Sequence, residues 1–457
     1  MLDGGPVRSS EEASVMEVER RDGVVLSVLS SPPSVIGSRS EDVLARVIPI
    51  GKQMVWQAYK KVKRKGGGGG IDGESMQEFD EEKSDNLYRI WNRLSSGSYQ
   101  APPVLEVKIP KGSGQTRSLG IPTVGDRIAQ EVIRSYLSPR LESEFVSNSY
   151  GYRPGRSAHE ALASVRENVQ RYDWVIDLDI SNFFTEVSHD LMLRALSRHL
   201  EVEETWVGMY IQRWLSAPIF KEDGSWCYHE GLGTPQGGVI SPLLSNLYLH
   251  YALDKWLGTT YPGQRYTRYA DDVIIHCSSL EEAEEILSSI RERLSACHLR
   301  LNESKTRIVY CKDRRRRGSH PHVYFDFLGF RFQPRTSCVK YGRLVLLFDC
   351  GISPGSISRI TQWFSHKAAR NWAGRELSEI AQFFNAKIRG WLQYYGAFRR
   401  HLLWRIFRRF HRRLVKWAIN RYKRFGRSKR RAAKWIRRLI KSRPETFVHW
   451  RTEFSRA

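Results

Sequence analysis

Acidic residues are missing from a long part of the C-terminal third of the chain. Residues 380–444 contain no Asp or Glu, and residues 399–457 carry 22 Lys and Arg against two Glu. This amounts to +20 of the net charge of +24, so the preceding residues carry only +4. The two glutamates of this region cannot neutralise its 22 basic side chains. The pattern favours a polyanionic partner, most simply nucleic acid.

Closely spaced cysteines and long apolar runs are absent too. The six cysteines lie far apart, without a C-x-x-C pair, which argues against both a zinc site and a disulfide framework. No apolar run approaches the length of a membrane span, and the polar start MLDGGPVRSSEE differs from a signal peptide. We therefore expect a reduced, cytoplasmic protein without a membrane partner.

Strand and helix patterns are mixed in the first part of the chain, and helical patterns alone follow residue 354. Strands or hairpins are predicted at 104–122, 174–184, 265–277, 299–311 and 325–332. Helices are predicted at 38–65, 126–143, 188–200, 241–257, 281–296, 354–372, 376–396 and 401–424. This order predicts an α+β body followed by a helical domain.

Helix starts and one joint are predicted from short local signals. Ser38 and Glu41 fit a capping box, Ser188 and Ser241 fit N-caps, and Pro242 follows in the first turn. The five glycines at 66–70 are expected to end the first helix and to form a flexible joint.

Two adjacent carboxylates, Asp271 and Asp272, stand between the strand-like stretches of RYTRYADDVIIHC. A solvated hairpin turn tolerates such a pair, because Asp suits turn geometry. A divalent cation would also hold it. Asp177 and Asp179 end another apolar strand, two residues apart and therefore on one face. Converging carboxylates of this kind can bind the two Mg²⁺ ions of phosphoryl transfer.

Five motifs in a fixed order resolve this choice. YADD, DLDISNFF, GTPQGGVISPLLSN, YGYRPGRSAHEAL and IPKGSGQTRSLGIPTVGDRIAQE, together with FLGFRF and GWLQYYG, closely resemble the reverse transcriptases encoded in bacterial group II introns. The resemblance covers about residues 41–457. It implies a right-hand polymerase: an N-terminal extension at 1–40, fingers at 41–165, a palm with an antiparallel sheet at 166–345, a helical thumb or maturase domain at 350–425, and a basic DNA-binding tail at 426–457.

The resemblance also assigns site residues. Asp179, Asp271 and Asp272 match the metal-binding triad; Asp179 is chosen over Asp177 because an aromatic residue, Phe184, lies five positions on. Phe184 matches the ring that excludes a 2′-hydroxyl and so selects dNTPs, although a core aromatic is the alternative. Thr185 stands where many relatives carry Asp.

Further matches concern the nucleotide. Gln236 and Gly237 match the loop that closes on the nucleotide and template, and Lys111 and Arg117 match the triphosphate grip, with solvated turn charges as the alternative. Lys305 matches a lysine thought to protonate the leaving pyrophosphate. FLGFRF matches the primer grip, which a plain core hairpin would explain equally well.

The basic C-terminal region begins with an amphipathic pattern. Leu403, Phe407, Phe410, Leu414 and Trp417 form one helical stripe, and arginines occupy the rest. A membrane surface or a partner groove could bind such a helix, but the lack of acids favours nucleic acid. The stripe itself is expected to pack inside the thumb. Residues after Gly426 have few apolar side chains and are expected to contribute little core.

These features together predict an RNA-directed DNA polymerase that uses two Mg²⁺ ions, with maturase activity in intron splicing and retromobility, in the bacterial cytoplasm or nucleoid. Its expected partners are group II intron RNA, target DNA, a primer and dNTPs. No H-N-H endonuclease domain is expected, so the primer would come from elsewhere. Two alternatives remain open: a reverse transcriptase recruited to phage defence or CRISPR spacer acquisition, and a non-enzymatic RNA-binding splicing factor.

Overall fold

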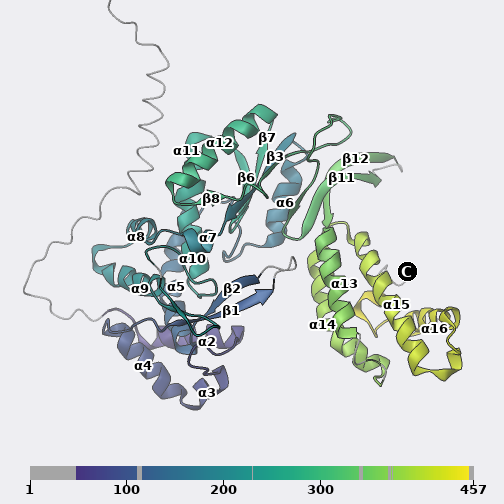
Figure 1. The fold of residues 1–457 in the computed structure, drawn as a ribbon, viewed down its shortest axis with the longest axis horizontal. Coiled ribbons are helices and arrows are strands. Elements are labelled where there is room, and N and C mark those ends of the chain that lie inside the picture. Colours follow the sequence, from purple (N-terminus) through teal and green to yellow (C-terminus); the bar gives the residue numbers. More distant parts are fainter. Residues whose placement is uncertain are drawn as a thin grey trace, which may run out of the picture.

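The computed structural model describes residues 48–110, 116–228, 230–338, 343–368, 372 and 374–451. The predicted N-terminal extension, the capping box of Ser38 and Glu41, and Lys111 lie outside these ranges. In Figure 1 the chain forms a broad body of sheets and helices and a separate group of C-terminal helices beside it. This agrees with the predicted α+β body and helical C-terminal domain.

The fingers are mainly helical, with one hairpin. Their elements are α2 (Lys52–Lys65), α3 (Met76–Glu81), α4 (Lys83–Ser95), β1 (Val104–Pro110), β2 (Thr116–Ile121) and α5 (Val124–Glu144). The prediction of helix throughout 38–65 is wrong for residues 48–51. Gly51 is the N-cap, and helix begins only at Lys52, after a bend in which Ile48 and Ile50 are buried in the core.

The glycine run at 66–70 is packed, which contradicts the expected flexible joint. Arg127, at the start of α5, donates from Nη2 to the Gly68 carbonyl at 2.6 Å. A Cβ on Gly69 would lie 2.6 Å from the Gly73 carbonyl oxygen, and one on Gly70 would lie 2.6 Å from the Thr123 nitrogen. Glycine is needed here because the chain passes close to another backbone.

The palm is built on an antiparallel sheet. Its strands are β3 (Trp174–Ser181), β6 (Arg265–Tyr269), β7 (Asp272–Cys277), β8 (Arg300–Leu301) and β9 (Arg307–Tyr310), in the order β6-β7-β3-β8 with β9 also beside β3. Ile176 and Leu178 of β3 face the large core shared with the fingers. Val175 lies on the opposite face, in a second core with helix α6 (Ala158–Asn168).

Helices between these strands connect the palm to the fingers. They are α7 (Phe183–Glu186), α8 (His189–Ser197), α9 (Thr205–Leu215), α10 (Ser241–Leu249), the π-helical η2 (His250–Asp254), α11 (Lys255–Thr260) and α12 (Leu280–Ala296). A short 3₁₀ turn, η1 (Val202–Glu204), precedes α9. Strands β4 (Ile219–Phe220) and β5 (Trp226–Cys227) extend the β1–β2 hairpin into a four-stranded sheet.

The two predicted N-caps in this region have different outcomes. Ser188 is an N-cap as predicted, because its side chain accepts from the Leu191 nitrogen. Ser241 is not: the N-cap is Ile240, and Ser241 is the first helical residue. Its hydroxyl donates instead to the Pro235 carbonyl at 3.1 Å, which fixes the preceding loop.

A three-stranded sheet joins the palm to the C-terminal helices. It consists of β10 (Phe325–Phe327), β11 (Phe330–Cys338) and β12 (Leu344–Ile352). Phe330, the first residue of β11, contacts Tyr394, Tyr395 and Phe398 at ring-centroid distances of 5.5–5.6 Å. The helical region then contains α13 (Pro354–Ala368), α14 (Leu377–Tyr395), η4 (Arg400–Leu403), α15 (Trp404–Arg421), η5 (Lys423–Phe425), α16 (Lys429–Ser442) and η6 (Val448–Arg451).

Residues after Gly426 belong to the core of the helical region, so the expectation that they contribute little core is wrong. Ala432, Ile436 and Ile440 of α16 recur every four residues and are buried on one helix face. Trp450 is 2 % exposed, and its Nε1 donates to His411 Nε2 of α15 at 3.1 Å. A few well-placed apolar residues suffice because the basic residues between them point to solvent.

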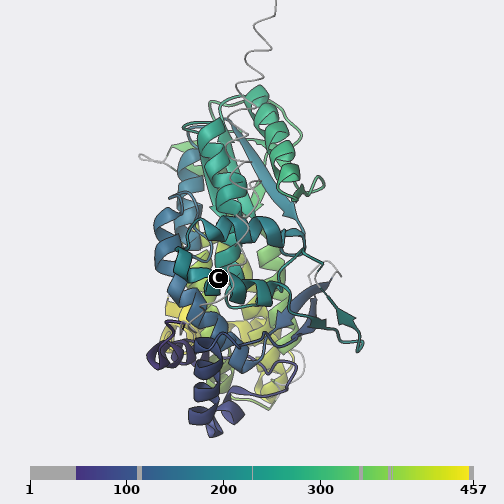
Figure 2. The same cartoon turned by 90° about the vertical axis from the view of Figure 1, so that its left-hand side faces the viewer.

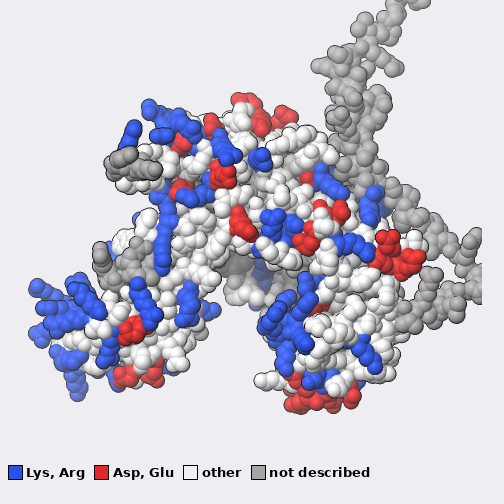
Figure 3. Space-filling model, turned by 180° about the vertical axis from the view of Figure 1, so that it is seen from behind, with Lys and Arg blue, Asp and Glu red and all other residues white. Residues whose placement is uncertain are grey.

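The two parts of the molecule leave an open space between them. Turned by 90°, the palm lies above the fingers, with the C-terminal helices behind (Figure 2). The space-filling view shows a hollow between the helical region and the fingers, with Lys and Arg side chains on both sides of it (Figure 3). A nucleic acid lying in this hollow would pass beneath the palm sheet.

Burial of Trp450 predicts that the end of the chain stabilises the helical domain. Trp450→Ala should lower the free energy of unfolding of this region by about 3–5 kcal/mol, because it empties a large buried site. Glu445→Ala, at an exposed position, should change it by less than about 0.5 kcal/mol. Urea denaturation of the full chain measures both. An equal, small effect of the two variants would mean that residues after Gly426 are a dispensable tail.

Candidate active site

The turn of the β6–β7 hairpin presents two carboxylates. Tyr269 pairs with Asp272, so Ala270 and Asp271 form a two-residue turn. Ala270 has φ +58°, a conformation that costs energy for any residue except glycine. A Cβ on Gly151 would lie 2.4 Å from the Ala270 nitrogen, so the chain at Gly151 presses directly on this turn. The turn is therefore held from outside rather than by its own preference.

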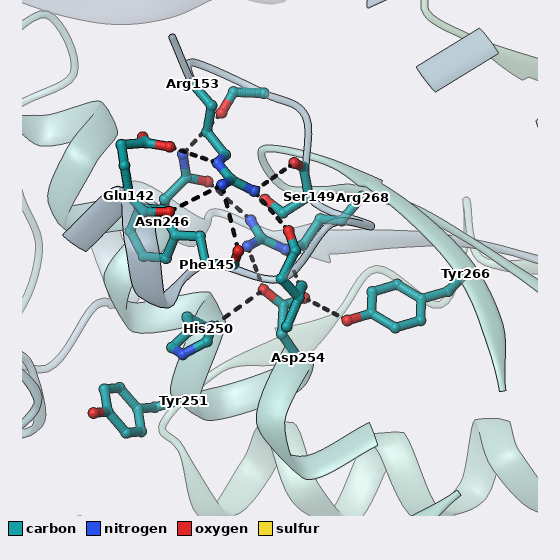
Figure 4. Close-up of polar contacts among 12 residues, drawn as sticks. Glu142, Phe145, Ser149, Arg153, Asn246, His250, Tyr251, Asp254, Tyr266 and Arg268 are labelled. Carbon is teal, nitrogen blue, oxygen red and sulfur yellow. Dashed lines mark hydrogen bonds and ion pairs between the residues drawn. The ribbon is translucent and has the colours of Figure 1, made fainter. Parts of the chain in front are cut away.

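A buried arginine provides much of that support (Figure 4). Arg268 is fully buried; it donates to Asp254 from Nε at 3.0 Å and from Nη2 at 2.5 Å. Its Nη1 donates to Asn246 Oδ1 at 2.9 Å and to the Ala270 carbonyl at 3.2 Å. The same guanidinium thus links helix α10 and the π-turn η2 to the first residue of the catalytic turn.

The segment before α6 lies along β6 and is fixed in the same way. The Tyr150 nitrogen donates to the Arg268 carbonyl and the Arg268 nitrogen donates to the Asn148 carbonyl, both at 2.9 Å. Arg153 donates to the carbonyls of Val146 and Ser149 and forms an ion pair with Glu142 at 2.9 Å. Gly151 is held against the turn by these contacts.

The third carboxylate comes from the neighbouring strand. Asp179 pairs directly with Asp272 across the β3–β7 ladder, and its carbonyl accepts from the Asn302 nitrogen at 2.8 Å. Asp179 Oδ2 lies 2.9 Å from Lys305 Nζ. Asp177, two residues earlier, is on the same strand face but pairs with Ile274 and Arg307. The structure therefore brings Asp179, Asp271, Asp272 and Lys305 together.

The carboxylates destabilise one another's ionised forms. Burial raises the pKa of Asp272 to about 7, and the charges of Asp271 and Asp179 add to the rise. Burial also raises the pKa of Asp271, against the opposing effects of Arg117 and Lys305. Burial, together with the charge of Asp272, raises the pKa of Asp177 to about 7. The side chain of Asp272 is nevertheless exposed at the surface, and that of Asp271 is half-buried, so solvent reaches the pair.

This arrangement fits a divalent cation. In the part of the chain that the structure describes, no group of three or more His, Cys, Asp or Glu side chains is placed to hold a metal ion by itself. Mg²⁺ does not require one, because it keeps waters and takes phosphate oxygens from its substrates. The raised pKa values show that the ionised carboxylates are poorly stabilised by the protein alone. A bound divalent cation would stabilise them.

A cavity of about 430 Å³ lies between the fingers and the loop after β5; none of the three carboxylates lines it, but Arg117 on its wall acts electrostatically on Asp271. Its walls include Phe184, Gln236, Gly237 and Arg117, four of the residues assigned from sequence. Arg117 of β2 donates from Nε to Gln236 Oε1 at 2.7 Å, and the Gly120 nitrogen donates to the Gln236 carbonyl at 2.6 Å. The loop after β5 is thereby joined to the fingers hairpin.

Gly237 is required by this close approach. It has φ +123°, and a Cβ there would lie 2.3 Å from the Gly120 carbonyl oxygen. On the other side, Gln130 Oε1 accepts from the Val239 nitrogen at 2.7 Å, and Gln130 in turn donates to the buried Asp126 at 2.9 Å. The loop is held on both sides, so its shape is set before any substrate binds.

Phe184 differs from its neighbour Phe183 in position. Phe183 is 3 % exposed and packs against Tyr248 in the core, whereas Phe184 is half-buried and lines the cavity. Phe184 is therefore not merely a core aromatic.

Three cavity residues were missed by the sequence assignment: Lys65, Arg127 and Tyr152. Tyr152 has φ +59° and is 59 % exposed. Partial burial of its hydroxyl raises the pKa of Tyr152; the charge of Asp271 adds to the rise and that of Arg117 opposes it. Its place in the motif YGYRPGR was a usable signal. Arg127 lies in the motif IPKGSGQTRSLGIPTVGDRIAQE and had the same signal, whereas Lys65 lies in none of the motifs.

The primer-grip motif FLGFRF forms the β10–β11 turn, with Phe327, Phe330 and Phe332 all buried. Its apolar residues therefore belong to the core.

A second cavity, of about 500 Å³, lies between α13 and α15 and is lined by Trp404 and four arginines, Arg405, Arg408, Arg409 and Arg412. The cavity is lined by the basic face of helix α15. The opposite, apolar face of this helix is buried, as predicted. None of the described helices has the length and apolarity needed to cross a membrane.

Comparison with known proteins agrees with this geometry. Residues 109–332 match the family model of reverse transcriptase (RNA-dependent DNA polymerase), and residues 357–435 match the maturase-specific domain of group II introns. Protein YkfC of Escherichia coli is 32 % identical over 312 residues, which span 60 % of this chain and 78 % of that protein.

Two further relatives carry intron-related names. The group II intron-encoded protein LtrA of Lactococcus lactis is 35 % identical over 190 residues, 41 % of this chain and 30 % of that protein. Nuclear intron maturase 1 of Arabidopsis thaliana is 34 % identical over 77 residues, 17 % of this chain and 11 % of that protein. The reverse transcriptase domain indicates RNA-directed DNA polymerase activity. The chain belongs to the family of reverse transcriptases that carry a group II intron maturase domain.

Proposed function

We propose that the chain copies RNA into DNA at Asp179, Asp271 and Asp272, and that it does so on behalf of a group II intron RNA bound by its helical domain. The observation that carries the catalytic part is the pairing of Asp179 with Asp272 at the end of the sheet, together with a cavity whose wall includes Arg117, which acts electrostatically on Asp271. Carboxylates and a phosphate-binding arginine are the groups that nucleotidyl transfer needs.

The residues divide the work by position. Asp179, Asp271 and Asp272 would hold two Mg²⁺ ions, which activate the primer 3′-hydroxyl and balance the charge of the pyrophosphate. The 3′-hydroxyl gives its proton to water, its oxygen bonds to the α-phosphorus of the dNTP, and the bond from that phosphorus to pyrophosphate breaks. Arg117 binds the triphosphate, together with Lys111, which lies six residues earlier in the sequence. Phe184 contacts the sugar at C2′, and Gln236 with Gly237 forms the floor beneath the nucleotide.

Lys305 has a second partner in this scheme. Its Nζ balances Asp179 at 2.9 Å. To protonate the leaving pyrophosphate, Lys305 would first have to leave this carboxylate. Its side chain is 61 % exposed and can make that movement.

The helical domain supports the RNA partner. Its basic face suits a folded RNA, because arginines can bind phosphates and Trp404 can stack on a base. Target DNA would bind to the neighbouring basic surface of the same domain. A splicing factor without catalysis would not need the supported turn and the shaped cavity. Recruitment to phage defence or CRISPR spacer acquisition has no feature in its favour here.

Loss of a metal-binding carboxylate should abolish synthesis without loss of RNA binding. Asp271→Ala and Asp179→Ala should each reduce primer extension on an RNA template by about 10³-fold or more, since each removes charge stabilisation in the transition state. RNA affinity should stay within about twofold. Asp223→Ala, in a distant exposed loop, is the matched control. Normal extension by either active-site variant would disprove the assignment.

The raised pKa of Asp272 predicts a pH-dependent gain in stability on its removal. A carboxylate with a folded pKa near 7 and an unfolded value near 3.8 makes folding less favourable as pH rises from about 4 to 7. In EDTA, Asp272→Asn should therefore raise the melting temperature at pH 8 and have little effect at pH 4. Glu284→Gln on exposed α12 should do neither. Equal shifts at both pH values would show that the pKa of Asp272 is not raised in the folded protein.

The position of Phe184 predicts a role in sugar selection. Phe184→Ala should increase rNTP incorporation relative to dNTP by about tenfold or more, because a clash with the 2′-hydroxyl is removed. Phe183→Leu, in the adjacent core position, should leave the ratio unchanged. Single-nucleotide incorporation kinetics give the ratio. If Phe184→Ala is folded and active with a wild-type ratio, Phe184 does not contact the sugar.

A further inference from the structure

Four consecutive arginines, Arg314–Arg317, lie in the connection between β9 and β10. We call residues 312–322 the basic palm loop. It has five basic residues against one acidic residue, and no apolar side chain. Neither the carboxylate site nor the nucleotide cavity includes any of it. Such a run normally extends into solvent as a mobile segment, but this one is built into the protein.

Arg316 anchors the first half of the loop. It is 6 % exposed; it donates to the carbonyls of Val169 and Tyr172 at the end of α6 and pairs with Asp313 at 2.6 Å. Asp313 also accepts from the main-chain nitrogens of Arg315 and Arg316. A buried charge with this many partners fixes the backbone around it.

The second half is fixed against the palm sheet. His320 packs against Trp174 and Tyr310 at ring-centroid distances of 4.5 Å each. The Gly318 nitrogen donates to the Tyr310 hydroxyl, and the Tyr310 nitrogen donates to the His322 carbonyl at 2.9 Å. Between the two anchors, the Arg314 nitrogen donates to the Leu346 carbonyl of β12 at 3.1 Å.

This framework presents three arginines outward. Arg314, Arg315 and Arg317 are exposed, and Arg315 and Arg317 donate to main-chain carbonyls. Among the described residues, no carboxylate lies within ion-pair distance of these three, whereas the exposed Arg171 and Arg291 are paired with Glu167 and Glu303. Figure 3 shows Lys and Arg side chains gathered on this side of the palm, at the upper left.

The loop is remote from polymerisation. Trp174 pairs with Cys277 and Tyr310 at one end of β3, and Asp179 pairs with Asp272 five residues further on. At about 3.3 Å per residue, the loop starts roughly 16 Å from the carboxylates, at the opposite end of the sheet. The loop therefore takes no part in the carboxylate site itself.

We propose that the basic palm loop binds the phosphate backbone of a folded RNA, at a site separate from the path of template and primer. Arginine forks fit phosphate, and a loop already ordered loses little entropy on binding. Duplex DNA and an acidic protein would also meet positive charge here. RNA is favoured because the maturase domain implies an intron RNA partner, and a folded RNA is large enough to contact the helical domain and the far end of the palm together. The inference rests on the proposed intron RNA partner.

The test replaces the three outward arginines and keeps Arg316. The variant Arg314→Gln/Arg315→Gln/Arg317→Gln is compared with the corresponding triple Lys variant, which keeps the charge. Binding to a folded group II intron transcript and to a DNA duplex is measured over a range of salt concentrations, together with extension of a short primed RNA. Thermal unfolding of each variant verifies folding. Should the triple Gln variant unfold, Arg317→Glu takes its place.

The Gln variant should bind the transcript about tenfold or more weakly at moderate salt, with a log-affinity against log-salt slope shallower by about 2 to 3. The Lys variant should keep the wild-type slope, and extension and duplex binding should not change. Unchanged transcript binding, weakened duplex binding alone, or loss of short-template extension would each overturn the inference. Failure of the wild-type chain to extend any primer would instead count against the proposed function, and the binding data would still stand.

Discussion

The buried ion pair between Arg268 and Asp254 is the interaction on which the active site depends. Removing one partner from such a pair leaves an uncompensated charge in the core and typically costs about 3–5 kcal/mol. Here the arginine also donates to the carbonyl of Ala270, the residue held at positive φ in the catalytic turn. Asp254 ends the π-helical turn η2, an irregularity that often occurs at functional sites. The strained backbone of Ala270 and the ion pair of Arg268 with Asp254 are therefore directly linked, through the hydrogen bond from Arg268 to the Ala270 carbonyl.

The same logic extends outward from the turn. Each catalytic feature is unfavourable by itself: a strained Ala270, neighbouring carboxylates with raised pKa values, and a glycine loop pressed on the fingers hairpin. Each is held by groups buried behind it, such as Asn246, Gln130 and Asp126. Burial raises the pKa of Asp126 to about 6, so this support carries a cost of its own. The fold keeps in place a site that favours cations and phosphates, at some expense of stability.

The sequence predicted the parts of this arrangement that are local. Strand periodicity located β3 and the β6–β7 hairpin, and the motif order singled out carboxylates that lie together and two residues, Phe184 and Gln236, that line one cavity. It failed where long-range packing decides. The glycine run reads as a joint, but Arg127 and Thr123 fill the space around it. The last 26 described residues read as a tail, yet Phe447 and Trp450 close the core of the helical region. The π-turn at His250–Asp254 leaves no pattern in a helix that is buried all round.

The most direct measurement is the extension rate of Arg268→Lys. Lysine keeps the positive charge, but its single nitrogen has three N–H donors and cannot replace the four hydrogen bonds of Arg268, two of which go to the two oxygens of Asp254. With the chain folded, as verified by thermal unfolding, the account predicts an extension rate about 100-fold or more below wild type. A higher Mg²⁺ concentration for half-maximal rate and nearly unchanged RNA affinity should accompany it. A folded Arg268→Lys protein that extends primers at the wild-type rate, with the wild-type Mg²⁺ requirement, would show that the turn does not depend on this arginine.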